Sequence, residues 1–547
     1  MAVHLPPRPL PARPGTGYTL APAMSLRLLE QLDRHATDRP DDVAIGHAAA
    51  GTSSRNTVTW TELRDVARRL SGELTARVPP GGVLLLCSPN RAEFTAAFLG
   101  GLRAGLRVFP VSPTLAAAEL RAAADQSAAA AIIGTPAAVV AVRDLVPTAA
   151  DVDAVFRPTG TFPPAGGLPA ASAAPRSPES AALLLHSSGT TGVPKVVVRT
   201  GRSLDAVAAA TAEAVGFGPG DRVLACVPLC HSYGIEHGLL APLWAGSTVR
   251  LCQGFDVPTV LAELDVGATI FPGVPFAYEA VAARAGGRAT PGQGAGDGAT
   301  AGRRFPALRR AYSAGGPLPD AVVVACRVNL GLTVTQLYGA TEIGSVTYAD
   351  PDLFGFDPAS VGRGMRGVDV RILPPDAAGV GSPLPAGEVG QVAVRADSML
   401  TGYLDGSPAP LLGGYFLTGD LGRLEPAGNL TVTGRLKLLI EVGGLKVNPL
   451  EVEAALAEHP AVAACLVVPL PVSPTVTRLK AIVVARRPGG AGEAVAGAVE
   501  TAFADGEALR RFLRERLAPY KVPRLVEFRA DLPRSAAGKV LRQQVEP

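Results

Sequence analysis

The sequence predicts an α/β protein with a large N-terminal body, a small β unit and a small α+β unit at the C-terminus. Up to about residue 365, apolar strand-like runs alternate with helical runs, which is typical of parallel β-sheets covered by helices. Beyond that point the runs become short strands separated by turns, and the last hundred residues mix helices and strands. A chain of 547 residues is also too long for a single core, so two or more domains are expected.

The individual elements follow from apolar runs and their breakers. An apolar spacing near 3.6 residues, closed by glycine, predicts a helix over 91–105. Residues 127–142 are broken by Gly134 and Pro136 and predict a strand, a turn and a helix that is too short to span a membrane. Strands are predicted in the body at 81–90, 106–113, 181–185, 221–229, 247–253 and 268–275.

The C-terminal third predicts two smaller units. Short strands at 367–373, 390–396 and 428–434 favour a small antiparallel sheet or barrel. The last unit has helices predicted at 449–460 and 507–518 and strands at 463–470, 478–486 and 524–529. Patterning therefore predicts a large body that carries a small independent unit.

Composition excludes several classes of function. The net charge of +3 is nearly balanced, so we expect no nucleic-acid partner and no electrostatic membrane binding. The six scattered cysteines favour buried free thiols in a reducing cytoplasm, because Cys226, Cys230 and His231 lack the fourth ligand of a structural zinc site. Residues 1–24 predict a disordered tail, and 163–180 and 285–304 predict flexible surface segments.

The stretch HSSGTTGVPK, residues 186–195, follows an apolar strand and combines hydroxyls, glycines and a lysine. Glycines let the backbone approach a ligand closely, while successive N–H groups, hydroxyls and an ammonium group suit phosphate oxygens. The spacing is not that of a Walker loop. The predicted phosphate-binding residues are Ser187, Ser188, Gly189, Thr190, Thr191, Gly192 and Lys195.

This stretch resembles the phosphate loop of the adenylate-forming (ANL) superfamily, which includes acyl-CoA synthetases and 4-coumarate–CoA ligases. Further motifs follow in that family's order, and the resemblance covers about residues 25–547: SAGGPLP (313–319), QLYGATE (336–342), YFLTGD (415–420), GRLK (434–437) and PRSAAGKVLR (533–542). It implies a body (25–434) of two helix-covered, mainly parallel β-sheets plus a small distorted β-barrel (about 365–434). A hinge (435–438) and a small mobile α+β lid (439–547) would follow.

The resemblance also implies residue roles. Tyr338 would lie near the adenine, Thr341 would bond the α-phosphate and Glu342 would help to hold Mg²⁺, a cation that keeps part of its hydration. Asp420 would accept from the ribose hydroxyls, and Arg435 would contact ribose and phosphate. Lys539 would neutralise charge during adenylation. The remaining implied nucleotide contacts are Gly315, Gly316, Pro317, Gln336, Leu337 and Gly339.

The implied reaction uses ATP and Mg²⁺ to convert a carboxylic acid into an acyl adenylate, and then CoA as the acyl acceptor. Lys437 would be the hinge residue about which the lid turns between the two steps. By the same resemblance, the thiol path would pass Gly443, Gly444 and Lys446. One departure stands out: Glu441 and Gly443 occupy positions where the coumarate-ligase pattern has lysines, which affects the thioester step more than adenylation.

The acid pocket is predicted in PLCHSYGIEHG, residues 228–238. His231, which we count among the catalytic candidates, would gate the carboxylate end. Tyr233, Gly234 and His237 would face the acyl group, with Gly344 on the far side. Polar side chains there, with the charge of Glu236 nearby, favour a small or aromatic acid over a long alkyl chain.

Three alternatives stay open at the level of sequence. The acyl group could pass to the thiol of a carrier protein acting in trans. The acceptor could be an amine, or the acid could be nitrite activated beside an aryl amine. The chain could also be a catalytically silent nucleotide-binding protein, although it retains Lys195, Glu342, Asp420, Arg435 and Lys539 together.

Overall fold

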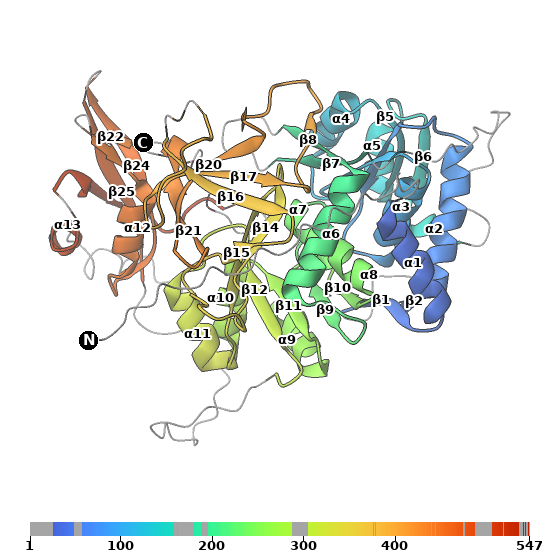
Figure 1. Ribbon diagram of the computed structural model, residues 1–547, viewed down its shortest axis with the longest axis horizontal. Helices are drawn as coiled ribbons and strands as arrows, with labels where there is room; N and C mark the ends of the chain where they lie inside the picture. The colour runs from blue at the N-terminus through green and yellow to red at the C-terminus, as the bar shows by residue number, and fades with distance from the viewer. Residues whose placement is uncertain are drawn as a thin grey trace, which may run out of the picture.

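The computed structural model shows two large β-sheets, a smaller antiparallel sheet and a separate C-terminal unit (Figure 1). The residues that the structure describes are 26–48, 57–157, 161, 177, 179–187, 195–286, 305–375, 377, 379–438, 440–442, 445–473, 476–486, 506–517, 519–534, 540, 542 and 545. The predictions for the 1–24 tail and for most of 163–180 and 285–304 fall outside these residues.

A seven-stranded sheet forms one end of the molecule (Figure 1). Its strand order is β18 (Gly402–Tyr403), β8 (Val196–Thr200), β7 (Ala181–His186), β4 (Arg107–Val111), β3 (Val83–Cys87), β5 (Ala129–Gly134), β6 (Thr148–Asp151). The strands from β7 to β6 are parallel, while β8 and β18 extend the sheet by antiparallel pairing. Strand β3 is buried along its whole length, as expected for an apolar run in a sheet covered on both faces.

A nine-stranded sheet occupies the centre of the molecule. Its order is β15 (Arg363–Gly364), β14 (Gly344–Tyr348), β13 (Thr335–Ala340), β12 (Arg310–Ser313), β11 (Ile270–Gly273), β9 (Arg222–Ala225), β10 (Thr248–Leu251), β1 (Val43–His47), β2 (Thr57–Thr59). The strands from β13 to β1 are parallel, and the edge strands β14, β15 and β2 pair antiparallel. Both sheets are therefore mainly parallel, as the resemblance implied.

Helices fill the space between the sheets and cover their outer faces. One apolar core joins the sheets through α1 (Arg27–Asp38), α2 (Trp60–Thr75), α3 (Ala92–Arg103), α6 (Gly201–Val215) and α8 (Ala241–Ala245). The outer faces are covered by α4 (Ala117–Gln126) and α5 (Pro136–Val142) on the seven-stranded sheet, and by α9 (Val257–Val266), α10 (Pro275–Gly286) and α11 (Asp320–Leu330) on the nine-stranded sheet. Helix α7 (Ser232–Ile235) runs directly into a π-helical turn, η2 (Glu236–Leu240).

Local sequence sets the ends of these helices. Helix α2 begins with a capping box, because the Thr59 hydroxyl accepts from the Glu62 N–H and the Glu62 carboxylate accepts from the Thr59 N–H. Helix α6 begins at the cap residue Thr200 and ends at Gly216, whose φ of +76° is the left-handed conformation that glycine adopts without strain. The cap residue Thr200 also ends strand β8, so the sequence passes from strand to helix without a loop.

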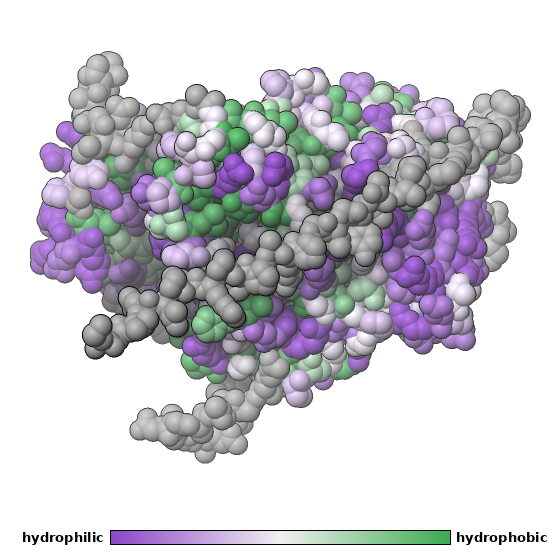
Figure 2. Space-filling view, in the orientation of Figure 1, coloured by the Kyte–Doolittle hydropathy of each residue, from purple (hydrophilic) through white to green (hydrophobic). Residues whose placement is uncertain are grey.

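An antiparallel sheet follows the nine-stranded sheet. Its order is β16 (Val368–Leu373), β17 (Gly390–Ala396), β20 (Tyr415–Leu424), β19 (Leu411–Leu412), with β21 (Leu430–Arg435) paired to the second half of β20. The barrel predicted over 365–434 is wrong: β16 pairs with β17 alone among the described strands, so the sheet stays open. In Figure 2, polar side chains cover the two ends of the molecule and apolar side chains reach the surface between them, near this sheet.

The C-terminal unit has its own small core. It contains the hairpin β22 (Ile440–Val442)–β23 (Leu445–Val447) and the sheet β24 (Val462–Ser473)–β25 (Val476–Ala485)–β26 (Leu525–Phe528), packed with α12 (Pro449–Ala457) and α13 (Gly506–Arg514). The helices and strands predicted for this part are confirmed. The short 3-10 turns are η1 (Val152–Ala154), η3 (Leu436–Leu438) and η4 (Pro519–Lys521).

Two further findings bear on composition. The six cysteines are free thiols, and all but Cys465 are fully buried, as predicted. Among the described residues, no helix combines the length and apolarity needed to cross a bilayer.

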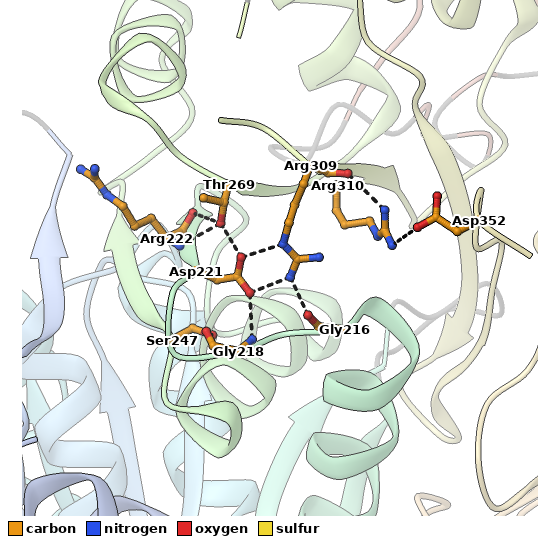
Figure 3. Close-up of polar contacts among 9 residues, drawn as sticks. All are labelled: Gly216, Gly218, Asp221, Arg222, Ser247, Thr269, Arg309, Arg310 and Asp352. Carbon is orange, nitrogen blue, oxygen red and sulfur yellow. Dashed lines mark hydrogen bonds and ion pairs between the residues drawn. The ribbon is translucent and has the colours of Figure 1, made fainter. Parts of the chain in front are cut away.

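Asp221 joins several segments by hydrogen bonds at the edge of the nine-stranded sheet where its parallel strands begin (Figure 3). Its carboxylate accepts from Arg309 through Nε at 2.8 Å and Nη2 at 2.6 Å, from Thr269 Oγ1 at 2.8 Å and from the Gly218 N–H at 2.8 Å. Burial alone would raise the pKa of Asp221, but the hydrogen bonds from Arg309 and Thr269 outweigh it and hold the pKa below its ordinary value. We interpret the Asp221 cluster as structural, because the loops that carry the motifs lie at the opposite edge of the nine-stranded sheet, where its parallel strands end.

Replacing Asp221 with asparagine is expected to lower the free energy of unfolding by about 3 kcal/mol, because it leaves the half-buried Arg309 without its anion. A carboxyl whose folded pKa is depressed contributes its stability above the unfolded pKa and loses it as the pH falls through the folded pKa. The difference between wild type and variant should therefore be full at pH 7 and shrink below about pH 4. Urea unfolding at both pH values checks this, and equal stability at pH 7 would contradict it.

Candidate active site

The predicted nucleotide-binding motifs converge where the two large sheets meet the antiparallel sheet. The β7–β8 hairpin, the β13–β14 hairpin, β18 and the β20–β21 pair all contribute side chains there. Strand β18 is the link, because Tyr403 belongs to the seven-stranded sheet yet lies against Glu342, the residue that follows Thr341 in the β13–β14 turn.

The two ends of the predicted phosphate loop are pinned together. The Ser187 N–H donates to the Lys195 carbonyl at 2.8 Å, and the Lys195 N–H donates to the Ser187 hydroxyl at 3.1 Å. These bonds continue the β7–β8 ladder, in which His186 pairs with Val196. The predicted contacts Ser188, Gly189, Thr190, Thr191 and Gly192 lie outside the described residues.

Lys195, Tyr403 and Glu342 form a compact group beside this loop. The Lys195 ammonium lies 4.6 Å from the centre of the Tyr403 ring, and the Tyr403 hydroxyl lies 3.5 Å from a Glu342 carboxylate oxygen. Burial raises the pKa of Glu342. A cation stabilises the charged form of a partly buried carboxylate, so Glu342 suits the binding of a cation.

The β13–β14 hairpin has a backbone shape that requires its glycines. A Cβ on Gly339 would lie 2.4 Å from the Gly344 carbonyl, so the strands could not approach with any larger residue there. Gly344 has a φ of +72°. Thr341 and Glu342 lie half-buried in the turn between them, and the Leu337 side chain packs into an apolar core behind it.

Asp420 joins Tyr338 to Arg435. One carboxylate oxygen accepts from the Tyr338 hydroxyl at 2.6 Å, and the other accepts from Arg435 Nε. The register of β20 and β21 sets this contact, because Asp420 pairs directly with Arg435. Burial raises the pKa of Tyr338 well above its ordinary value, so the phenol stays a hydrogen-bond donor to the carboxylate.

The loop after β12 lies beside β13. Gly315, Gly316 and Pro317 are exposed, and Gly315 has a φ of +86°. Gln336 holds this loop beside β13, since its side-chain oxygen accepts from the Leu318 N–H at 3.4 Å and its side-chain nitrogen donates to the Pro358 carbonyl at 3.1 Å.

Three residues predicted for the acid pocket line one hollow. Tyr233, Gly234 and His237 border a narrow hollow that has no room for a water molecule, and its other walls are Ala225, Val227, Gly238 and Pro272. A Cβ on Gly234 would lie 2.1 Å from the Pro228 carbonyl, so only glycine allows the chain to turn there. All seven lining residues are uncharged when His237 is neutral.

The predicted pocket residues outside this hollow lie elsewhere. His231 stands at the N-cap position of α7 without a capping hydrogen bond from its side chain; the ring is exposed at the surface, yet desolvation by the protein around it lowers its pKa. Gly344 lies against Arg199 and Ser398. Glu236, which the sequence places near the acyl group, does not present a free charge there: it is 1% exposed and forms an ion pair with Arg199 at 3.2 Å.

The predicted hinge and thiol-path residues are described only in part. Lys437 lies in the 3-10 turn Leu436–Leu438, and Lys446 lies in β23, where the backbone register places it opposite Glu441. Gly443, Gly444 and Lys539 lie outside the described residues.

The residues present fit a magnesium ion held largely by its nucleotide. In the described part of the chain, no three His, Cys, Asp or Glu side chains gather into a metal cage. Mg²⁺ commonly binds through one or two carboxylates, with phosphates and water completing its shell. Glu342, whose pKa is raised by burial, is the carboxylate suited to that position.

Sequence reasoning missed Arg199 and Tyr403, and it included Ser345 only as part of the segment 344–346 on the far side of the acid pocket. Each contacts a predicted site residue or its neighbour: Arg199 donates to the Thr341 carbonyl at 3.5 Å, Tyr403 contacts Glu342, and Ser345 lies 2.9 Å from His237. The sequence held a signal only for Arg199, which follows three valines in the strand VVVRT. An arginine in such an apolar strand needs a buried partner.

The likeness to known proteins extends over most of the chain. Residues 32–404 match the AMP-binding enzyme family, and residues 451–539 match the AMP-binding enzyme C-terminal domain. A feruloyl-CoA synthase from Amycolatopsis sp is 31% identical over 517 residues, covering 91% of this chain and 95% of that protein. A sulfoacetate–CoA ligase from Cupriavidus necator is 29% identical over 544 residues, covering 96% of each chain.

Solved structures share the fold. ATP-bound MatB from Rhodopseudomonas palustris has a TM-score of 0.80 at 23% identity and covers 95% of this chain and 98% of its own. The o-succinylbenzoate CoA synthetase from Bacillus subtilis, in complex with its acyl-adenylate intermediate, has a TM-score of 0.77 at 26% identity and covers 94% and 97%. This chain therefore belongs to the AMP-binding enzyme family of the adenylate-forming superfamily, as an AMP-forming ligase of the acyl-CoA synthetase type.

Proposed function

We propose that this acyl-CoA synthetase activates a small or aromatic carboxylic acid whose tail carries no charge. The observation that supports this is the chemistry of the wall beside α7; the hollow there has no room for a water molecule, so an acid would have to displace part of that wall to bind. His237 is fully buried, and burial lowers its pKa to about 3, so the ring is neutral at physiological pH. Glu236, the residue before His237, is neutralised by Arg199. An acid with a second anionic group would find no counter-ion in this wall.

In the first half-reaction an oxygen of the acid's carboxylate attacks the α-phosphorus of ATP, and the bond to pyrophosphate breaks. We assign the chain's work to positioning and charge neutralisation. Lys195 and the 187–192 loop hold phosphate oxygens, Thr341 bonds the α-phosphate, and Asp420 with Arg435 holds the ribose. Mg²⁺ at Glu342 would neutralise phosphate charge when bound, and Lys539 would do so at the α-phosphate.

In the second half-reaction the CoA sulfur attacks the carbonyl carbon of the acyl adenylate, and the bond to AMP breaks. The proposal places the thiol path beside Gly443, Gly444 and Lys446, with Lys437 as the hinge. The proposal also assigns His231 to the carboxylate end of the acid, where its exposed ring can reach a ligand.

A second candidate concerns the acceptor alone. The hairpin β22–β23 places Glu441 opposite Lys446, so an acidic residue lies in the segment where a thiol acceptor with phosphates is expected to pass. This favours testing a carrier-protein thiol or an amine alongside CoA. It leaves the adenylation step unchanged.

Pyrophosphate release against a panel of acids tests the proposal. Benzoic, cinnamic and ferulic acids should be used at least about 100-fold more efficiently than oxalic or sulfoacetic acid, because burying an unpaired anion costs several kcal/mol. Each acid is run with and without CoA, and products are identified by mass. Preference for the dianionic acids would contradict the pocket assignment, and release without an acyl-CoA product would favour another acceptor.

A further inference from the structure

A buried chain of polar side chains joins the segments that carry the binding motifs. It begins at Tyr312, passes through His237 and Ser345 to Glu236, and ends at Arg199. Each of these residues is less than 5% exposed. They come from β12, from η2 beside the acid hollow, from β14 and from β8.

The hydrogens in this chain can point in only one direction. The Glu236 carboxylate, paired with Arg199, only accepts, so the single hydroxyl hydrogen of Ser345 goes to it at 2.7 Å. His237 Nε2 must then donate to Ser345 Oγ at 2.9 Å, and His237 Nδ1 must accept from the Tyr312 hydroxyl at 2.9 Å. The neutral ring of His237 is thus fixed in one tautomer and one orientation.

The far end of the chain holds the turn that carries Thr341 and Glu342. The Glu236 oxygen that takes the Ser345 hydroxyl also accepts the Ser345 N–H at 2.9 Å, just after the turn. Arg199 Nη1, which contacts Glu236, donates to the Thr341 carbonyl within the turn at 3.5 Å. Arg199 is on β8, which begins directly after Lys195, so the end of the predicted phosphate loop is connected through this strand to the Arg199–Glu236 pair.

We propose that Arg199 and Glu236 are positioning residues for adenylation: they set the Thr341–Glu342 turn relative to the acid hollow, so that carboxylate and α-phosphate meet. The inference rests on the proposed function of these motifs. A buried ion pair is weak support for stability, because the cost of desolvating two charges offsets their attraction. A role in aligning the two reactants explains the Arg199–Glu236 pair better, because a displacement of a reacting group by about 1 Å can cost about 100-fold in rate.

Glu236→Gln tests this with almost no change in volume. We expect kcat for pyrophosphate release to fall by about 10- to 100-fold, while the KM for ATP changes by less than about threefold, because the loss lies in alignment and not in nucleotide binding. Ser345→Ala cuts the chain at its middle hydroxyl and should lower kcat in the same direction by a smaller factor.

The matched control is Asp221→Asn, which also removes a carboxylate charge from an arginine–carboxylate pair, here a partly buried one, but lies at the opposite edge of the sheet. Measured well below its unfolding midpoint, this variant should keep the wild-type kcat. If Glu236→Gln also keeps the wild-type kcat and loses only stability, the pair is structural and the proposal is overturned.

A binding measurement separates failure of this inference from failure of the proposed function. Inactivity of the wild type with every acid would refute the proposed function, while this inference would still be decided by binding. Calorimetry with AMP and with benzoyl-sulfamoyl adenosine, a stable mimic of an acyl adenylate, needs no turnover. Glu236→Gln should weaken the mimic by more than about 10-fold and AMP by less than about threefold; equal changes for both ligands would overturn the inference.

Discussion

Replacing Asp420 with alanine is expected to raise the KM for ATP by about 100-fold or more, with little change in the KM for the acid. Asp420 is 3% exposed and accepts from both Tyr338 and Arg435. A carboxylate offers about four acceptor positions, so two remain for the ribose hydroxyls. Removing it takes away that acceptor and also releases Arg435 and Tyr338 from the positions in which we propose that they contact the nucleotide. Steady-state kinetics with varied ATP measures the effect.

Asp369 provides a matched control in the same sheet. It also accepts from a tyrosine and an arginine, Tyr415 and Arg395, but it lies on β16 with its side chain 39% exposed. Asp369→Ala should leave the KM for ATP unchanged. If both variants behave alike, Asp420 braces the sheet and does not bind the ribose.

The parallel core could be predicted from sequence because its elements are local patterns. Strands such as β3 and β5 are uninterrupted apolar runs bounded by turn residues, and α3 shows helical spacing closed by glycine. The architecture of the antiparallel sheet was harder to predict from sequence. Whether it closes depends on pairing between distant edges, and β18 and β19 have only two residues each, too few for any periodicity. β18 in fact leaves this region and pairs with β8.

In the site, too, local motifs could be predicted from sequence and long-range contacts could not. The positions of Lys195, Asp420 and Arg435 in their motifs could be predicted, and the structure brings Asp420 and Arg435 into contact. The direction of Glu236 could not, because its partners Arg199 and Ser345 lie 37 and 109 residues away. Spacing along the chain reports which residues share a segment, but burial and pairing decide which way a charged side chain points.

Replacing Glu342 with glutamine is expected to lower kcat by about 100-fold or more and to raise the Mg²⁺ concentration needed for half-maximal rate. The side chain keeps its size and its contact with Tyr403 but loses the charge that suits a divalent cation. Glu425→Gln is the matched control, since this carboxylate is paired with Arg423 outside the motif cluster. It should leave both quantities unchanged.

The pH dependence makes this prediction specific for the carboxylate. Burial raises the pKa of Glu342, and only the ionised form binds a cation, so a fall in pH should weaken Mg²⁺ binding by the wild type. Glutamine does not titrate, so the variant should show only the dependence that ATP itself brings to both proteins. The difference between the two proteins, measured as half-saturating Mg²⁺ at pH 8 and at about pH 5, near the ordinary glutamate pKa, isolates the contribution of Glu342. If wild type and Glu342→Gln showed an identical pH dependence of Mg²⁺ binding, other groups would hold the metal. The substitution removes the titration of Glu342, so the pH dependence must change if Glu342 is a ligand.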